Sequence, residues 1–158
     1  MFTPTSTSHG IFFHNLDLLN DAVDICTATT HINRAEVIIT SPNYPSVYPV
    51  GKTCNIVVNF QEKAPFCMEF LGEFELEESA YWSSCIDFVK IRNGKDSNAP
   101  LIMKKCGSIK PHTSYLIGSS VWIQFYSDYG FGMKGFSLKV SQRETCGGKI
   151  KSLIRNQL

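Results

Sequence analysis

Three acidic residues stand where predicted strands begin or end, and together they could hold a metal ion. Glu77 closes the segment FELE, Asp87 lies just after Cys85, and Asp128 lies in the segment FYSDYG. Carboxylates crowded together repel one another unless a cation neutralises them. Ca²⁺ takes about six to eight oxygen ligands from carboxylates, carbonyls and water, so such a set suits it. From spacing alone, the alternative is that these acids are simply solvated at strand ends.

Other patterns that could carry chemistry lack their partners. Residues 130–135, GFGMKG, match a glycine-rich phosphate loop, but a dinucleotide site needs a helix next, and GFSLKV predicts a strand. A nucleophilic Cys67 would need a neighbour that favours its thiolate, and the residues beside it supply none. The sequence has no HExxH or GxSxG motif, so zinc hydrolysis and a serine triad lack their parts. The histidines are scattered: His9, His14, His31 and His112. The sequence therefore predicts that the chain is not an enzyme.

Six cysteines favour disulfides over a metal site. Each is more than 12 positions from the next, whereas zinc ribbons use closely spaced pairs. Disulfides persist in oxidising compartments, and the start of the sequence shows no signal peptide. We therefore expect a fragment of a larger secreted or cell-surface protein.

Charge and hydropathy exclude two classes of partner. The 158 residues carry 15 Lys and Arg against 14 Asp and Glu, a net charge of +1, whereas a dedicated nucleic-acid binder needs a basic face. No apolar run approaches the about 20 residues that span a bilayer. We expect no nucleic-acid binding, no membrane insertion by this segment, and one globular domain with flanks.

Strands are needed to position the three acids. From about residue 35 onward, apolar residues alternate with polar ones, a pattern that predicts strands. Turn-forming segments separate them at 41–45 (SPNYP), 93–96 (NGKD) and 129–132 (YGFG). Many short strands without a long helix predict an all-β antiparallel sandwich. The clearest inward-facing sets are Ile56, Val58 and Phe60; Val121, Ile123 and Phe125; and Phe136, Leu138 and Val140.

Several motifs follow one another along the chain in a distinctive order. They are SPNYP, Cys54, FELE, Cys85 followed by DFVKIRNG, Cys106-Gly107, FYSD and Gly135-Phe136. This order resembles the CUB domain, an extracellular sandwich module of complement proteases, tolloid-type metalloproteases and cubilin. The resemblance implies a jelly-roll-like antiparallel β-sandwich, the CUB fold, at residues 26–142. It also implies two disulfides, Cys26–Cys54 and Cys85–Cys106.

The resemblance further implies calcium. Calcium-binding members use a Glu ending the FxLE strand, an Asp after the third cysteine and the Asp of the SD loop, here Glu77, Asp87 and Asp128. The carbonyl of Gly130 is an expected further ligand. Tyr48 matches a family tyrosine that hydrogen-bonds near the ion, although plain packing would also explain it. The sequence departs from the family in the inserted segment ESAYWSS, in the single residue between the third cysteine and its Asp, and in lacking an initial Cys-Gly-Gly, all of which bear on loop geometry.

These residues predict an extracellular, calcium-dependent protein-recognition module of a larger, multi-CUB protein. Glu77 and Asp128 would offer oxygens to a Lys or Arg of a protein partner, and Tyr129, Phe131 and Tyr48 complete the expected partner-binding set. One alternative is the substrate-positioning part of a tolloid-like or trypsin-like protease. Another is a spermadhesin-like glycan binder, which predicts saccharide binding that survives calcium chelation; nothing in these residues favours it.

The two ends of the chain carry their own expectations. Residues 1–25 are expected to be a flank or linker, in which Leu16, Leu19 and Val23 offer one short helix. Residues 143–158 contain TCGGKI, which looks like the first strand of a second CUB domain cut short. For Cys67 the sequence leaves three states open: a free thiol, a bond to Cys146, or a bond to a missing segment.

Overall fold

The computed structural model describes residues 22–81 and 84–146, and over these ranges every regular element is a strand. Within the same ranges there is no helix with the length and hydropathy needed to span a membrane. The strands are β1 (Ala22–Asp24), β2 (His31–Asn33), β3 (Glu36–Thr40), β4 (Lys52–Glu75), β5 (Phe88–Arg92), β6 (Leu101–Lys105), β7 (Ser114–Ser127) and β8 (Gly135–Gln142).

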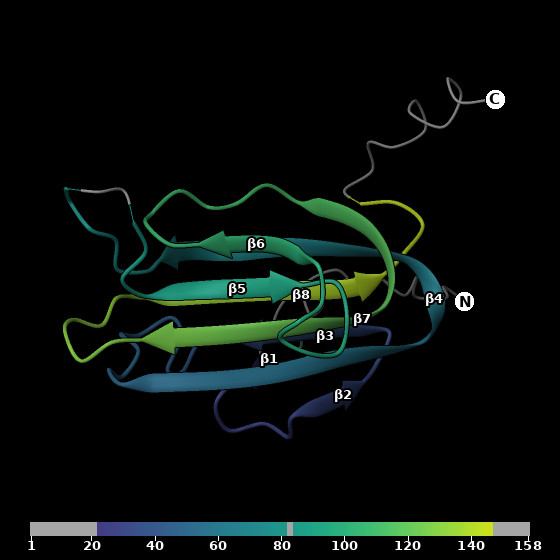
Figure 1. The fold of residues 1–158 in the computed structure, drawn as a ribbon, viewed down its shortest axis with the longest axis horizontal. Helices are drawn as coiled ribbons and strands as arrows, with labels where there is room; N and C mark the ends of the chain where they lie inside the picture. The colour runs from purple at the N-terminus through teal and green to yellow at the C-terminus, as the bar shows by residue number, and fades with distance from the viewer. Residues whose placement is uncertain (1–21, 82–83, 147–158) are drawn as a thin grey trace, which may run out of the picture.

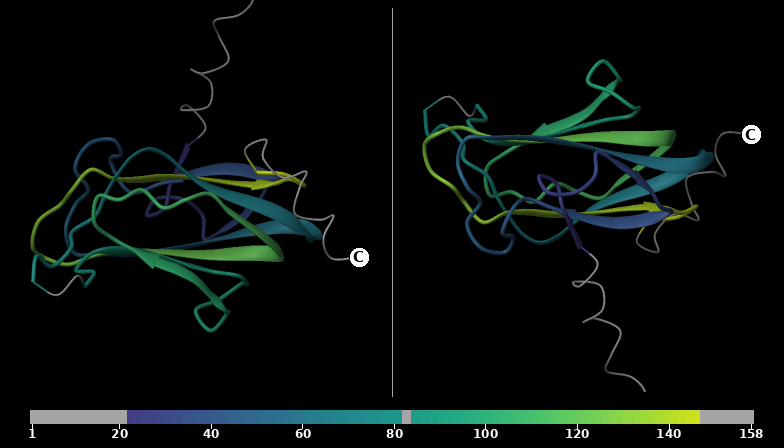
Figure 2. Two further views of the ribbon diagram at one scale, coloured as in Figure 1. Left: turned by 90° about the horizontal axis from the view of Figure 1, so that it is seen from above. Right: turned by 90° about the horizontal axis from the view of Figure 1, so that it is seen from below.

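The strands form two packed layers, as the views along their edges show (Figure 2). One layer contains β1, β3, β8 and the second half of β4, and the other contains β2, the first half of β4, β7, β5 and β6. Strand β4 belongs to both because it bends at a register shift between Asn59 and Ala64, where it turns back in Figure 1. The predicted all-β sandwich is confirmed.

The core lies between the layers. It includes the side chains that the alternation of apolar and polar residues predicted to face inward. Ile56 pairs with Ile123 across β4 and β7, and both are at most 1% exposed. Phe136, Leu138 and Val140 of β8 are fully buried. Trp122, which alternation along β7 turns to the face opposite Ile123, is also buried. It lies in register between Val57 of β4 and Arg92 of β5.

Two strand pairs are parallel, where the sequence predicted an antiparallel sheet. Strand β1 pairs parallel with β3, and β2 pairs parallel with β4. Both short strands lie at sheet edges, and neither is joined to its partner strand by the tight hairpin that makes a pair antiparallel. Strand β1 lies within the expected flank and includes Val23; residues 1–21, with the rest of the expected helix, lie outside the described residues.

Three disulfides join the strands. The structure contains Cys26–Cys54 and Cys85–Cys106, the pairs that the family resemblance implies. It also joins Cys67 to Cys146, so of the three states left open for Cys67 it takes the second. This bond ties β4 to the segment after β8. The expected start of a second domain remains a prediction, since residues 147–158 lie outside the described residues.

Candidate metal centre

The three predicted acids meet at one end of the sandwich. One oxygen from each of Glu77, Asp87 and Asp128 lies within 4.8 Å of the other two. Glu77 follows β4, Asp87 precedes β5 and Asp128 follows β7. These ends coincide because β5 and β7 run antiparallel with Phe88 opposite Tyr126. At the end of β4, Leu76 exchanges backbone hydrogen bonds with Gly107.

Asp87 is the fully buried member of this trio, which we call the acidic cluster. Its Oδ2 accepts a 2.6 Å hydrogen bond from the Tyr48 hydroxyl, and its Oδ1 accepts a 2.8 Å bond from the Asp128 amide. Burial, reinforced by the hydrogen bond to Asp87, raises the pKa of Tyr48 well above its ordinary value. Tyr48 therefore stays protonated and serves Asp87 as a fixed donor.

Glu77 leaves one carboxylate oxygen without a partner. Its backbone carbonyl accepts hydrogen bonds from the amides of Ile86 and Asp87, and its own amide donates to the Tyr48 hydroxyl at 3.2 Å. These bonds hold the backbone but leave Oε2 buried, with no hydrogen-bond partner among the described residues. A buried carboxylate oxygen without a donor is costly, so this atom is suited to a cation.

The loop after β7 completes the wall of the cluster. The Gly130 amide donates to Asp128 Oδ1 at 2.6 Å, and the Gly51 amide donates to the Asp128 carbonyl. A Cβ at Gly130 would lie 2.9 Å from that Oδ1 and 3.4 Å from Glu77 Oε2, so a side chain would crowd the space between the acids. Carboxylate oxygens suit a hard cation such as Ca²⁺ better than zinc, which favours nitrogen and sulfur.

The inserted segment ESAYWSS does not separate Glu77 from Asp87. Glu78 and Cys85 form an isolated bridge, and the Ser79 amide donates to the Ser84 carbonyl at 2.9 Å. The two ends of the insertion therefore stay side by side.

The expected partner-binding residues divide into exposed and buried ones. Tyr129 is 89% exposed and Phe131 74% exposed. Tyr48 was expected to contact a partner, but it is only 1% exposed and lies beneath the surface. Its role is therefore to position other residues. Sequence reasoning missed Val47, which is 57% exposed beside Gly132. Its only signal was its place in the turn next to Tyr48.

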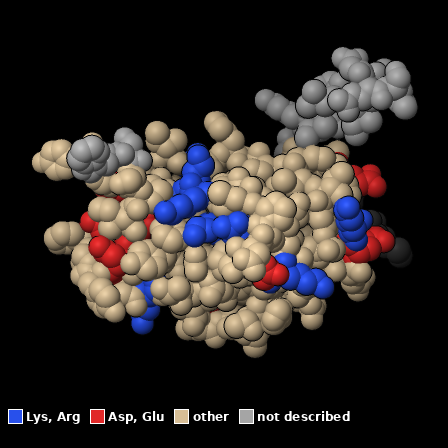
Figure 3. Space-filling model, viewed as in Figure 1, with Lys and Arg blue, Asp and Glu red and all other residues tan. Residues whose placement is uncertain are grey.

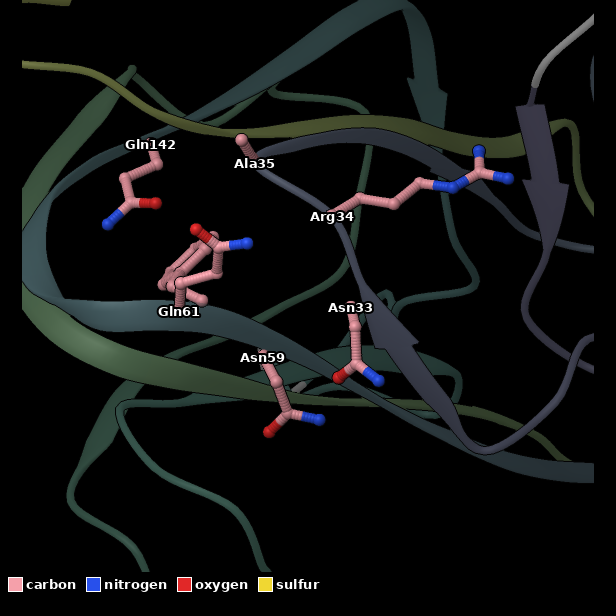
Figure 4. Close-up of a pocket in the computed structure, with 7 residues that line it drawn as sticks. Asn33, Arg34, Ala35, Asn59, Gln61 and Gln142 are labelled. Carbon is pink, nitrogen blue, oxygen red and sulfur yellow. The ribbon is translucent and has the colours of Figure 1, made fainter.

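Figure 4 shows a hollow whose lining includes none of the three acids. It occupies about 290 Å³ between the ends of β2 and β8 and the bend of β4, and carboxamides supply most of its polar groups. Its lining offers neutral carboxamide oxygens but no carboxylate, imidazole or thiolate. Its lining residues are Asn33, Arg34, Ala35, Asn59, Phe60, Gln61 and Gln142.

Substituting Tyr48→Phe should destabilise the fold without creating a cavity. The variant deprives buried Asp87 Oδ2 of its donor and the Glu77 amide of its acceptor. We expect a loss of about 1–3 kcal/mol in the free energy of unfolding, measured by urea denaturation in EDTA. Tyr126→Phe is the matched control, since its half-buried ring stacks on Phe88 and its hydroxyl has no hydrogen bond within the described ranges. Equal losses in both variants would contradict the role assigned to Tyr48.

Comparison with known protein sequences places this architecture in a family. The family model of the CUB domain matches residues 26–140. Tolloid-like protein 2 of Mus musculus is 33% identical over 126 residues, covering 80% of this chain and 12% of that protein. Cubilin of Rattus norvegicus is 30% identical over 127 residues, covering 79% of this chain and 3% of cubilin. Neuropilin-2 of Homo sapiens is 39% identical over 103 residues, covering 64% of this chain and 11% of neuropilin-2. The chain thus spans only a small part of the length of these relatives.

Solved structures share the fold. The CUB2 domain of MASP-1, crystallised bound to Ca²⁺, superposes with a TM-score of 0.64 at 24% identity, covering 72% of this chain and 98% of that one. The full extracellular region of zebrafish Gpr126/Adgrg6 matches with a TM-score of 0.60 at 27% identity, covering 76% of this chain and 15% of that one.

Proposed function

The chain belongs to the CUB domain family, and from this premise we propose that it binds Ca²⁺ through Glu77, Asp87 and Asp128. The observation that carries the proposal is the convergence of three carboxylates around a buried, unpartnered oxygen of Glu77. The calcium in the similar MASP-1 domain supports it. The carbonyl of Gly130 is the proposed additional ligand. When bound, the ion would neutralise the repulsion among the acids.

The chain is an extracellular protein-interaction module. Its three disulfides fit an oxidising compartment, and one structure with the same fold is the extracellular region of a larger protein. We further propose that the module is non-catalytic and belongs to a multi-CUB protein. A protease parent is the alternative because of the tolloid-like relative, but cubilin and neuropilin-2 match at comparable identity and do not favour it.

We propose that the partner is a protein offering Lys or Arg to this end of the sandwich. Bound Ca²⁺ would hold the carboxylates of Glu77 and Asp128 in place, and hydrogen bonds already fix the backbone that carries them. Less ordering entropy would therefore be lost when a cationic side chain binds. Tyr129 and Phe131 stand exposed on the same loop and can cover the aliphatic stem of such a side chain.

Calcium should raise the thermal stability of the chain. A ligand that binds only the folded state adds about 3 kcal/mol at a hundredfold excess over its dissociation constant, which for this domain means a rise on the order of 10 °C in the unfolding midpoint. The measurement is a thermal unfolding series in EDTA, Ca²⁺ and Mg²⁺, paired with calorimetric titration. Mg²⁺ should have a smaller effect because it demands a compact octahedral site. A midpoint that Ca²⁺ does not move would remove the basis of the proposal.

A further inference from the structure

A second charged surface lies on the outer face of the sandwich, on β5 and β6. Lys90 and Arg92 are alternate residues of β5, and Lys90 pairs in register with Lys104 of β6. All three therefore share one face of the two strands. Figure 3 shows blue side chains gathered over β5 and β6 on this face. We call these three residues the basic face.

No acid among the described residues forms an ion pair with the basic face. Across residues 22–81 and 84–146, the ion pairs join Lys134 to Glu73, and Lys139 and Arg143 to Glu36; none involves the basic face. Burial lowers the pKa of Lys90, and the positive charges of Lys104 and Arg92 lower it further. Like charges placed together without a counter-charge cost free energy, which an external anion would recover.

An aromatic pair under the lysines orients them. Phe88 stacks on Tyr126 with ring centroids 5.1 Å apart and planes at 17°. The Lys104 ammonium lies 4.1 Å and the Lys90 ammonium 4.9 Å from the Phe88 centroid. Cation–π attraction to one ring therefore holds two like charges together at the surface.

The guanidinium of Arg92 adds a planar donor beside the lysines. One terminal nitrogen donates to the Ala99 carbonyl at 2.8 Å, which anchors the side chain against the loop after β5. Its Nε is buried and has no hydrogen-bond partner within the described part of the chain. Guanidinium groups bind tetrahedral oxyanions through paired hydrogen bonds.

The chemistry of this surface fits a polyanion better than a folded protein. The centre of a protein interface is usually depleted of Lys, whereas Lys90 and Lys104 occupy the centre here. The adjacent outward positions of β7 are Trp122, Gln124 and Tyr126, so no acid interrupts the strip. The sequence alone did not favour a glycan ligand, because Lys90 and Lys104 meet only through the register of β5 and β6. From this pairing we propose that the basic face binds a sulfated polysaccharide of the extracellular space, its sulfates contacting Lys90, Arg92 and Lys104 and displacing bound counterions.

The test measures binding of the chain to immobilised heparin by surface plasmon resonance, at about 0.15 M salt and in EDTA. We expect binding without calcium, steep weakening as salt rises, and a loss on the order of tenfold in Lys90→Gln/Lys104→Gln. Lys63→Gln/Lys134→Gln removes the same charge elsewhere and should bind within about twofold of the parent. Because the assay runs in EDTA, its outcome is independent of the calcium proposal.

Three results would overturn the assignment. These are no heparin binding by the parent chain, equal weakening in the two double variants, and binding of polyglutamate as tight as that of heparin, which would indicate an acidic protein partner. If Lys90→Gln/Lys104→Gln unfolds, the site is tested by chemical acetylation of lysines in the parent chain with and without heparin. Heparin should protect Lys90 and Lys104 from acetylation but not Lys63. Uniform protection, or none, would count against a site on this face.

Discussion

Asp128→Ala should weaken calcium binding on the order of a hundredfold or more while the sandwich remains folded. The side chain contributes one of only three carboxylates at the site. The backbone of Asp128 would stay in place, because its amide still donates to Asp87 and its carbonyl still accepts from Gly51. Glu77→Ala should have a similar effect, since it removes the buried, unpartnered oxygen. Calorimetric titration with Ca²⁺ measures both.

The fold is tested separately in EDTA. Without the ion the three carboxylates repel one another, so both variants should be at least as stable as the parent chain. Glu69→Ala is the control: this exposed residue of β4 removes one negative charge far from the cluster and should leave calcium affinity unchanged. Unaltered affinity in both Asp128→Ala and Glu77→Ala would show that calcium, if bound, binds elsewhere.

The same variants test the partner chemistry. An NMR titration of the calcium-loaded parent with N-acetyl-lysine amide should shift amide signals around Asp128 and Tyr129, and Asp128→Ala should lose these shifts. Simple charge attraction predicts the opposite calcium dependence, because removing Ca²⁺ makes the cluster more negative. Stronger lysine binding in EDTA would therefore contradict pre-positioning of the acids by calcium.

Replacing both Cys67 and Cys146 with Ala should produce the largest loss of stability among the three disulfides. The Cys67–Cys146 bond closes a loop of 79 residues, against 21 for Cys85–Cys106. In the chain-entropy description, a longer closed loop restricts the unfolded chain more. The stabilisation expected from the disulfide is about 4–5 kcal/mol for Cys67–Cys146 and about 3 kcal/mol for Cys85–Cys106. Guanidinium denaturation of the two double-alanine variants measures the difference.

This comparison also tests the pairing itself. If Cys67 and Cys146 are bonded, Cys146→Ala alone should leave one free thiol at the buried Cys67, which a thiol reagent detects in the denatured chain, and the parent chain should have none in this pair. A loss of stability from Cys67→Ala/Cys146→Ala no greater than that from Cys85→Ala/Cys106→Ala would show that loop length does not govern the contribution of this bond.

The local pattern predicted the strands from about residue 35 onward and placed the three acids at strand ends. Alternation selected Ile56, Ile123 and Leu138 as core residues because a strand turns successive side chains to opposite faces, whatever its partner is. The acids were found because residue type and position at strand ends are local properties, and the family resemblance joined them into one site.

Other features depended on contacts between distant segments, which no local pattern encodes. The bend of β4 between Asn59 and Ala64 moves one strand into both layers, and the pairing of Cys67 with Cys146 depends on where that strand and β8 end. The burial of Tyr48 and the meeting of Lys90 with Lys104 likewise arise from packing and strand register. The alternation of side chains along a strand determines on which face each residue lies. Only the packing of the two layers determines which other residues that face contacts.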